Sequence, residues 1–113
     1  MPAASEGGHV THYMRGCAGL YGLHILEAPL KADRYSIDLD ALESLARAKK
    51  PKLLNIGDSL NLFEHPVRNI RQIADAVGSD VRFDRAHQCG IIASKEWNSS
   101  LDEDAHFMTM STY

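Results

Sequence analysis

Acidic, imidazole and hydroxyl side chains stand directly after three short apolar segments of the chain. They belong to Gly57-Asp58-Ser59, Asp84-Arg85-Ala86-His87 and Ser111-Thr112-Tyr113. In an open parallel sheet the carboxyl ends of the strands share one edge, and ligands bind there. We therefore expect these side chains to form one small-molecule site, although Asp and Ser also cap helices and turns at such positions.

A second dense cluster of polar residues is Gly7-Gly8-His9-Val10-Thr11-His12. His9 and His12 are three positions apart and could bind a metal ion from one face of a helix. The other histidines are scattered along the chain and complete no Cys/His metal-binding template. The sequence therefore predicts no metal site.

The segments that must position these residues have the lengths of short strands. Four of them, at 21–28, 52–56, 80–84 and 106–111, are apolar and are bounded by Gly, Pro or Asp. Helical patterns separate them, and this alternation is typical of a parallel sheet with crossover helices.

Two main helices are predicted between the strands. In the first, Asp40 and Glu43 have the spacing of a capping box, and Pro51 stops the helix. The second runs from about Pro66 to Val77, with Gly78 just past its end. The fold class is therefore α/β, with about four parallel strands.

Composition narrows the class of protein. The chain has 113 residues, 44% of them hydrophobic, and a formal net charge of −3, which indicates one soluble globular domain. Its apolar runs are too short to span a bilayer, and its charge suits neither nucleic acid nor an anionic membrane. Cys17 and Cys89 stand outside any Cys-x-x-Cys motif, so we expect free thiols, a reducing compartment and a cytoplasmic location.

The last predicted strand runs to the end of the sequence without a covering helix. Parallel sheets are normally buried on both faces, and two helices cannot cover four strands. We therefore expect the chain to be a slice of a larger domain.

Six motifs in collinear order carry a family resemblance. They are Gly-Gly-His-Val-Thr-His (7–12), Ile-Asp-Leu-Asp-Ala-Leu-Glu (37–43), Lys-Pro-Lys-Leu (50–53), Arg-Gln-Ile-Ala-Asp-Ala-Val-Gly (71–78), Phe-Asp-Arg-Ala-His-Gln-Cys-Gly (83–90) and Met-Thr-Met-Ser-Thr-Tyr (108–113). This succession resembles the central part of serine hydroxymethyltransferase, a pyridoxal-phosphate enzyme of the aspartate-aminotransferase fold type. The resemblance spans 7–113 and implies a three-layer α/β/α fragment of the large domain.

The resemblance implies roles for individual residues around the cofactor. In the family, the position of His9 stacks on the pyridine ring, and the position of Asp84 pairs with the protonated pyridine nitrogen. The positions of His87 and Ser59 also contact the cofactor, and Ser111 matches a threonine run beside it. Gly8 and Val10 match positions near the folate.

Several positions depart from the family pattern. The lysine that binds the cofactor as a Schiff base should follow Tyr113, and none of the lysines in this sequence matches it. Tyr113 itself stands where the family has a histidine. Arg82 replaces an apolar residue of the third predicted strand, and Arg85 replaces a methionine. An arginine in a central strand is costly unless it is paired or exposed.

The resemblance implies a fragment of an enzyme that reversibly cleaves the Cα–Cβ bond of a β-hydroxy amino acid, such as serine or threonine. The parent family transfers the one-carbon unit to tetrahydrofolate and forms homodimers or homotetramers. We expect the isolated chain to be inactive without the lysine. The alternatives are a threonine aldolase or transaldolase of the same fold, and a non-catalytic truncated chain whose sheet edges pair with a partner.

Overall fold

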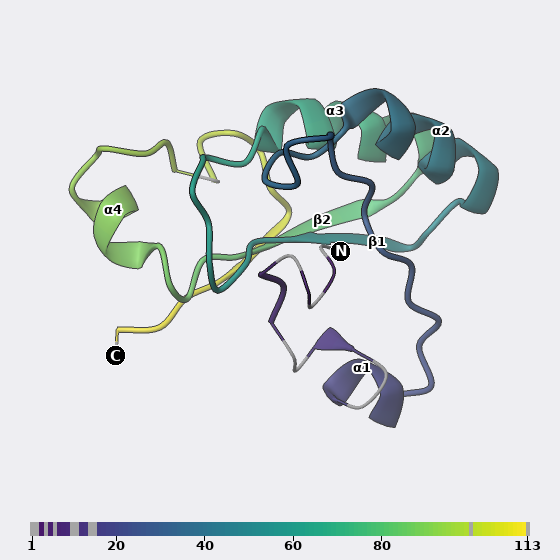
Figure 1. Ribbon diagram of the computed structural model, residues 1–113, viewed down its shortest axis with the longest axis horizontal. Helices are drawn as coiled ribbons and strands as arrows, with labels where there is room; N and C mark the ends of the chain where they lie inside the picture. The colour runs from purple at the N-terminus through teal and green to yellow at the C-terminus, as the bar shows by residue number, and fades with distance from the viewer. Residues whose placement is uncertain are drawn as a thin grey trace.

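The computed structural model describes residues 3, 5, 7–9, 12–13, 16–99 and 101–112. Its elements, in chain order, are α1 (Cys17–Leu20), α2 (Leu39–Lys49), β1 (Leu53–Ile56), α3 (Val67–Val77), β2 (Asp80–Asp84), α4 (Cys89–Ala93) and β3 (Phe107–Thr109). Figure 1 shows α2 and α3 on one side of the sheet and α1 on the other. Among these described residues, no helix is long and apolar enough to cross a membrane.

The three strands form a parallel sheet in the order β1-β2-β3. Leu53 of β1 pairs with Asp80, and Asp84 pairs with Thr109 of β3. This confirms the predicted α/β class and the strands expected near 52–56, 80–84 and 106–111. The central strand β2 matches its predicted bounds, whereas β1 and β3 are shorter than predicted.

The strand predicted at 21–28 is wrong, so the described sheet has three strands instead of four. Residues 21–22 form a turn after α1, and 23–29 have no regular structure. An apolar run becomes a strand only when another strand pairs with it. Here the nearest such feature is a single antiparallel bridge between Leu30 and Ile37.

Helix α2 begins two residues earlier than the predicted capping box. Asp38 is the N-cap, and its Oδ1 accepts the Ala41 backbone N–H at 3.0 Å. Glu43, the other half of the predicted box with Asp40, instead pairs with Arg47 one turn along at 2.6 Å. Asp38 and Asp40 both precede the apolar stripe, so the capping-box spacing predicted Asp40 as the N-cap although Asp38 has that role.

Helix α3 agrees with its prediction. It begins directly after Pro66, and Gly78 ends it in the left-handed conformation with φ of 72°. A glycine adopts that conformation without the cost that a Cβ would bring.

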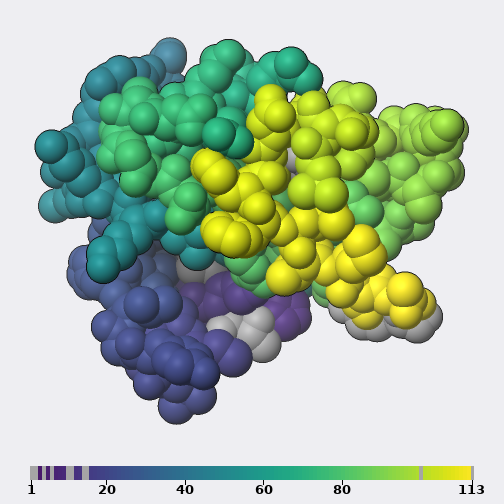
Figure 2. All heavy atoms as spheres, turned by 180° about the vertical axis from the view of Figure 1, so that it is seen from behind, coloured from purple at the N-terminus to yellow at the C-terminus, as the bar shows by residue number. Residues whose placement is uncertain are grey.

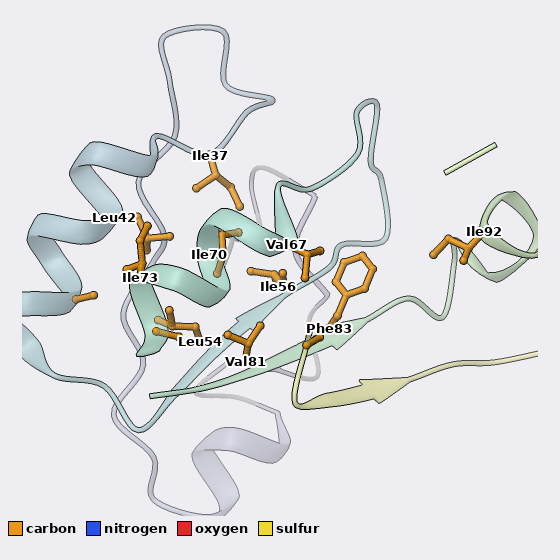
Figure 3. Close-up of a cluster of buried hydrophobic side chains, with 13 residues drawn as sticks. Ile37, Leu42, Leu54, Ile56, Val67, Ile70, Ile73, Val81, Phe83 and Ile92 are labelled. Carbon is orange, nitrogen blue, oxygen red and sulfur yellow. The ribbon is translucent and has the colours of Figure 1, made fainter. Parts of the chain in front are cut away.

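The core lies between α2, α3 and one face of the sheet, as Figure 3 shows. Ile70 of α3 and Val81 of β2 are its largest fully buried side chains. Strand residues alternate between faces, so Val81 and Phe83 point into this core. Arg82 and Asp84 lie on the opposite face, where the N-terminal segment covers them in part.

Candidate functional site

Gly57 brings the loop after β1 against the end of β2. Its φ is 96°, and a Cβ built on it would lie 1.9 Å from the carbonyl oxygen of Asp84. Only glycine fits this close backbone approach. Two residues later, the Ser59 backbone N–H donates to the carbonyl of Gly7 at 3.0 Å, which joins this loop to the N-terminal segment.

The Asp84 carboxylate at the tip of β2 is surrounded by donors. The Arg82 guanidinium lies 3.3 Å from Asp84 Oδ2, and His12 Nε2 lies 3.1 Å from the same oxygen. Asp84 Oδ1 accepts the Ala86 backbone N–H at 3.2 Å. The side chain is 18% exposed, so a fixed carboxylate still meets the solvent at the carboxyl end of the sheet.

The side chain of Arg82 in β2 contacts both neighbouring strands, on the same face of the sheet as Asp84. Its guanidinium donates to Asn55 Oδ1 of β1 at 2.6 Å and to Thr109 Oγ1 of β3 at 2.8 Å. An arginine in the central strand is therefore tolerated because it is paired on both sides and one-quarter exposed.

Three imidazoles gather above this face. The rings of His9 and His12 have centroids 5.8 Å apart, and those of His9 and His87 are 6.1 Å apart. His12 in turn contacts Asp84, so the predicted residues His9, His87 and Asp84 belong to one connected group.

A hollow of about 450 Å³ adjoins this group. Ser59 and His87, both predicted site residues, line it together with Tyr35, Gln88 and Trp97. Ser59 and His87 are thus brought together from loops that follow different strands, as the sheet-edge argument expects.

The last predicted site residue, Ser111, lies two positions past Thr109, the partner of Asp84 in the sheet register. It therefore follows the same edge of the sheet, which is the placement that the sequence predicts. Val10 and Tyr113 lie outside the described residues.

Sequence reasoning missed the part that His12 and Asn55 play beside Asp84. The period-two alternation of β2 places Arg82 and Asp84 on one face and could have predicted their pairing. No local pattern predicts His12, because an irregular segment brings it to the sheet from 70 residues away in sequence.

Burial and charge change the proton affinity of two groups here. Burial, with the nearby Arg82 guanidinium, lowers the pKa of His12 even though Asp84 opposes the change. Burial, with the carboxylates of Asp58 and Glu27, raises the pKa of Tyr13 to about 12. Both groups are therefore favoured in their neutral forms.

A carboxylate and imidazoles at the carboxyl end of parallel strands are suited to a cationic heteroaromatic ring. The adjoining hollow has largely apolar walls, such as Leu60 and Ile91, and shares His87 with this group. The chain also matches the family model described as serine hydroxymethyltransferase over residues 3–113. The chain belongs to the serine hydroxymethyltransferase family. This confirms the predicted family.

Curated aldolases and serine hydroxymethyltransferases match almost the whole chain. An alpha-methylserine aldolase of Variovorax paradoxus is 56% identical over 99% of the chain, and one of a Ralstonia species is 49% identical over 100%. The serine hydroxymethyltransferase of Archaeoglobus fulgidus is 41% identical over 95%. The chain spans 24–26% of the length of these relatives.

Proposed function

We propose that this chain supplies the ring-binding part of a pyridoxal-phosphate enzyme that cleaves the Cα–Cβ bond of a β-hydroxy amino acid. The observation that carries the proposal is the Asp84 carboxylate, held at the tip of β2 by Arg82, His12 and Ala86. His9 and His87 are connected to it through the ring of His12.

The residues present fit the pyridine half of the cofactor. A fixed carboxylate suits a protonated ring nitrogen, and a charge-assisted hydrogen bond of this kind contributes about 1.5–3 kcal/mol. When bound, pyridoxal phosphate supplies an electron sink for the charge left at Cα by bond cleavage. Asp84 would pair with the ring nitrogen, His9 would stack on the ring, and Ser59, His87 and Ser111 would provide polar contacts around it.

In the family, a lysine attaches the cofactor covalently, and this sequence has no lysine at the matching position. Its lysines are Lys31, Lys49, Lys50, Lys52 and Lys95, and none matches the family position. We therefore expect the 113 residues alone to bind the cofactor weakly and to catalyse no turnover.

Aldol cleavage without folate is the reaction that we favour. The two alpha-methylserine aldolases are 56% and 49% identical to this chain, whereas the Archaeoglobus hydroxymethyltransferase is 41% identical. The activity named for these two relatives makes α-methylserine the first substrate to test. Transfer of the one-carbon unit to tetrahydrofolate is the second candidate, and family membership supports it.

A chimeric enzyme tests the proposed function. The 112 residues of the Variovorax aldolase that align with this chain are replaced by those of this chain. We expect the chimera to retain pyridoxal phosphate and to release formaldehyde from α-methylserine without tetrahydrofolate. Formaldehyde is the expected product because cleavage of the Cα–Cβ bond detaches the hydroxymethyl carbon.

In that chimera, Asp84→Asn should weaken cofactor binding about 10- to 150-fold, the equivalent of one charge-assisted hydrogen bond. Asp80→Asn is the matched control, because it changes the same group on the same face of β2, with a side chain that is 56% exposed. Equal cofactor affinity in both variants would contradict the role of Asp84 in cofactor binding. Consumption of α-methylserine only with tetrahydrofolate present, with the one-carbon unit recovered on the folate, would favour the second candidate.

The remaining expectations concern partners and location. The parent family forms homodimers or homotetramers, and we propose the same assembly for the enzyme to which this chain contributes. Cys17 and Cys89 are both free thiols, which supports a reducing compartment such as the cytoplasm.

A further inference from the structure

The amide of Asn55 is oriented by Arg82. Arg82 Nη1 donates to Asn55 Oδ1 at 2.6 Å, so this end of the amide must be the oxygen. The other end, Nδ2, then faces His12 Nδ1 at 3.1 Å. Turning the amide around would place its NH₂ group against the guanidinium, donor against donor.

This orientation decides which nitrogen of His12 carries the hydrogen. Since Asn55 Nδ2 is a donor, His12 Nδ1 must accept, and the hydrogen of the neutral ring is on Nε2. His12 Nε2 lies 3.1 Å from Asp84 Oδ2, so the carboxylate faces this side of the ring. Arg82 Nη1, 3.3 Å from Nε2, then makes a contact between two donors instead of a hydrogen bond.

We propose that Arg82 is a positioning residue, which acts through Asn55 to hold His12 as the neutral Nε2–H tautomer and so to keep an uncharged N–H group beside the Asp84 carboxylate. The proton arrangement rests on the contacts of this chain alone. Its value to catalysis rests on the proposed function, in which Asp84 faces a protonated ring.

The charge balance shows why a neutral His12 matters. Arg82 and Asp84 together carry no net charge, and a protonated His12 would make the group positive beside a cationic ring. The other ionisable groups that act on His12 are His9 of the same segment and Asp58 of the loop after β1. A neutral His12 therefore leaves the group of Arg82, His12 and Asp84 without net charge, instead of positive, beside a cationic ligand.

Nitrogen-15 NMR of the full 113-residue chain, without cofactor, reads the tautomer directly. We expect His12 Nδ1 to have the chemical shift of a bare ring nitrogen and Nε2 that of a protonated one at neutral pH. A His12 with the hydrogen on Nδ1, or a doubly protonated ring at pH 7.5, would overturn the proposal without any variant.

Arg82→Met adds the causal test. The variant should weaken the preference for Nε2–H, because the Asn55 amide is then free to turn. Its His12 titration midpoint should move upward because a nearby positive charge is gone. Arg47→Met is the matched control, since Arg47 pairs with Glu43 on the exposed side of α2 and should leave His12 unchanged. If Arg82 had only a structural role, Arg82→Met would lower the stability and leave the His12 tautomer as in the parent chain.

A third variant covers the case in which Arg82→Met fails to fold. Asn55→Ala keeps Arg82 but removes the amide, and it should also weaken the tautomer preference. An unchanged His12 spectrum would refute the route through Asn55. These spectra are independent of pyridoxal phosphate. If the spectra show the Nε2–H tautomer but the chimera binds no cofactor, the proposed function is rejected and this inference still holds.

Discussion

At the scale of single residues, Arg82 and His12 give Asp84 its environment. Arg82 supplies a permanent positive charge 3.3 Å from the carboxylate, and His12 supplies a ring that burial favours in its neutral form. A cationic ligand at Asp84 would therefore meet one permanent charge and one neutral ring beside the carboxylate.

The lowered pKa of His12 predicts a pH dependence of stability. The unfolded chain, with a histidine pKa near 6.5, binds this proton more readily than the folded chain does. The free energy of unfolding should therefore receive the full contribution of His12 above pH 6.5 and lose it as the pH falls toward the lowered folded value. Urea denaturation at pH 7.5 and pH 5.5 would measure the loss.

Variants separate this contribution from that of other titrating groups. In His12→Asn the pH dependence should be weaker than in the parent chain, whereas His24→Asn, at an exposed position, should leave it unchanged. An equal pH dependence in the parent chain and in His12→Asn would show that His12 titrates alike in both states.

At the scale of elements, α3 is the part that the sequence predicts best. Its apolar positions follow a helical period, and both its ends carry residues that stop or start helices. The strand predicted at 21–28 failed because strand formation depends on a distant partner, which no local pattern encodes. The same dependence on distant partners limits the prediction of the site. The predicted strand ends identified Asp84 and Ser59, but no local pattern predicted the contact of His12 with Asp84.

Ile70 tests how much of the stability α3 carries. Its side chain is fully buried between the helices and the sheet, so Ile70→Ala should lower the free energy of unfolding by about 2–5 kcal/mol. Asn69→Ala, at the exposed neighbouring position of the same helix, should change it by no more than about 0.5 kcal/mol. Denaturant titration of both variants measures the difference, and similar losses would contradict the core as described.

At the scale of the whole molecule, stability is unevenly distributed. The buried cluster comes chiefly from α2, α3, β1 and β2. The segment that contains α1 projects away from these elements, as Figures 1 and 2 show. Helix α1 contributes no buried residue, and Leu20 and Tyr21 are 86% and 82% exposed. The core and the site therefore share the central strand β2, while the α1 segment adds little to either.

Hydrogen exchange of the backbone amides should report this division. Amides of β2 and α3 should exchange slowest, because their opening exposes the core around Ile70 and Val81, and those of residues 16–29 should exchange fastest. Ile70→Ala should speed exchange in β2 and α3 more than in 16–29, which is already open in the parent chain. Slow exchange in 16–29 that matches β2 would contradict this division, since it would mean that the α1 segment opens only when the entire sheet unfolds.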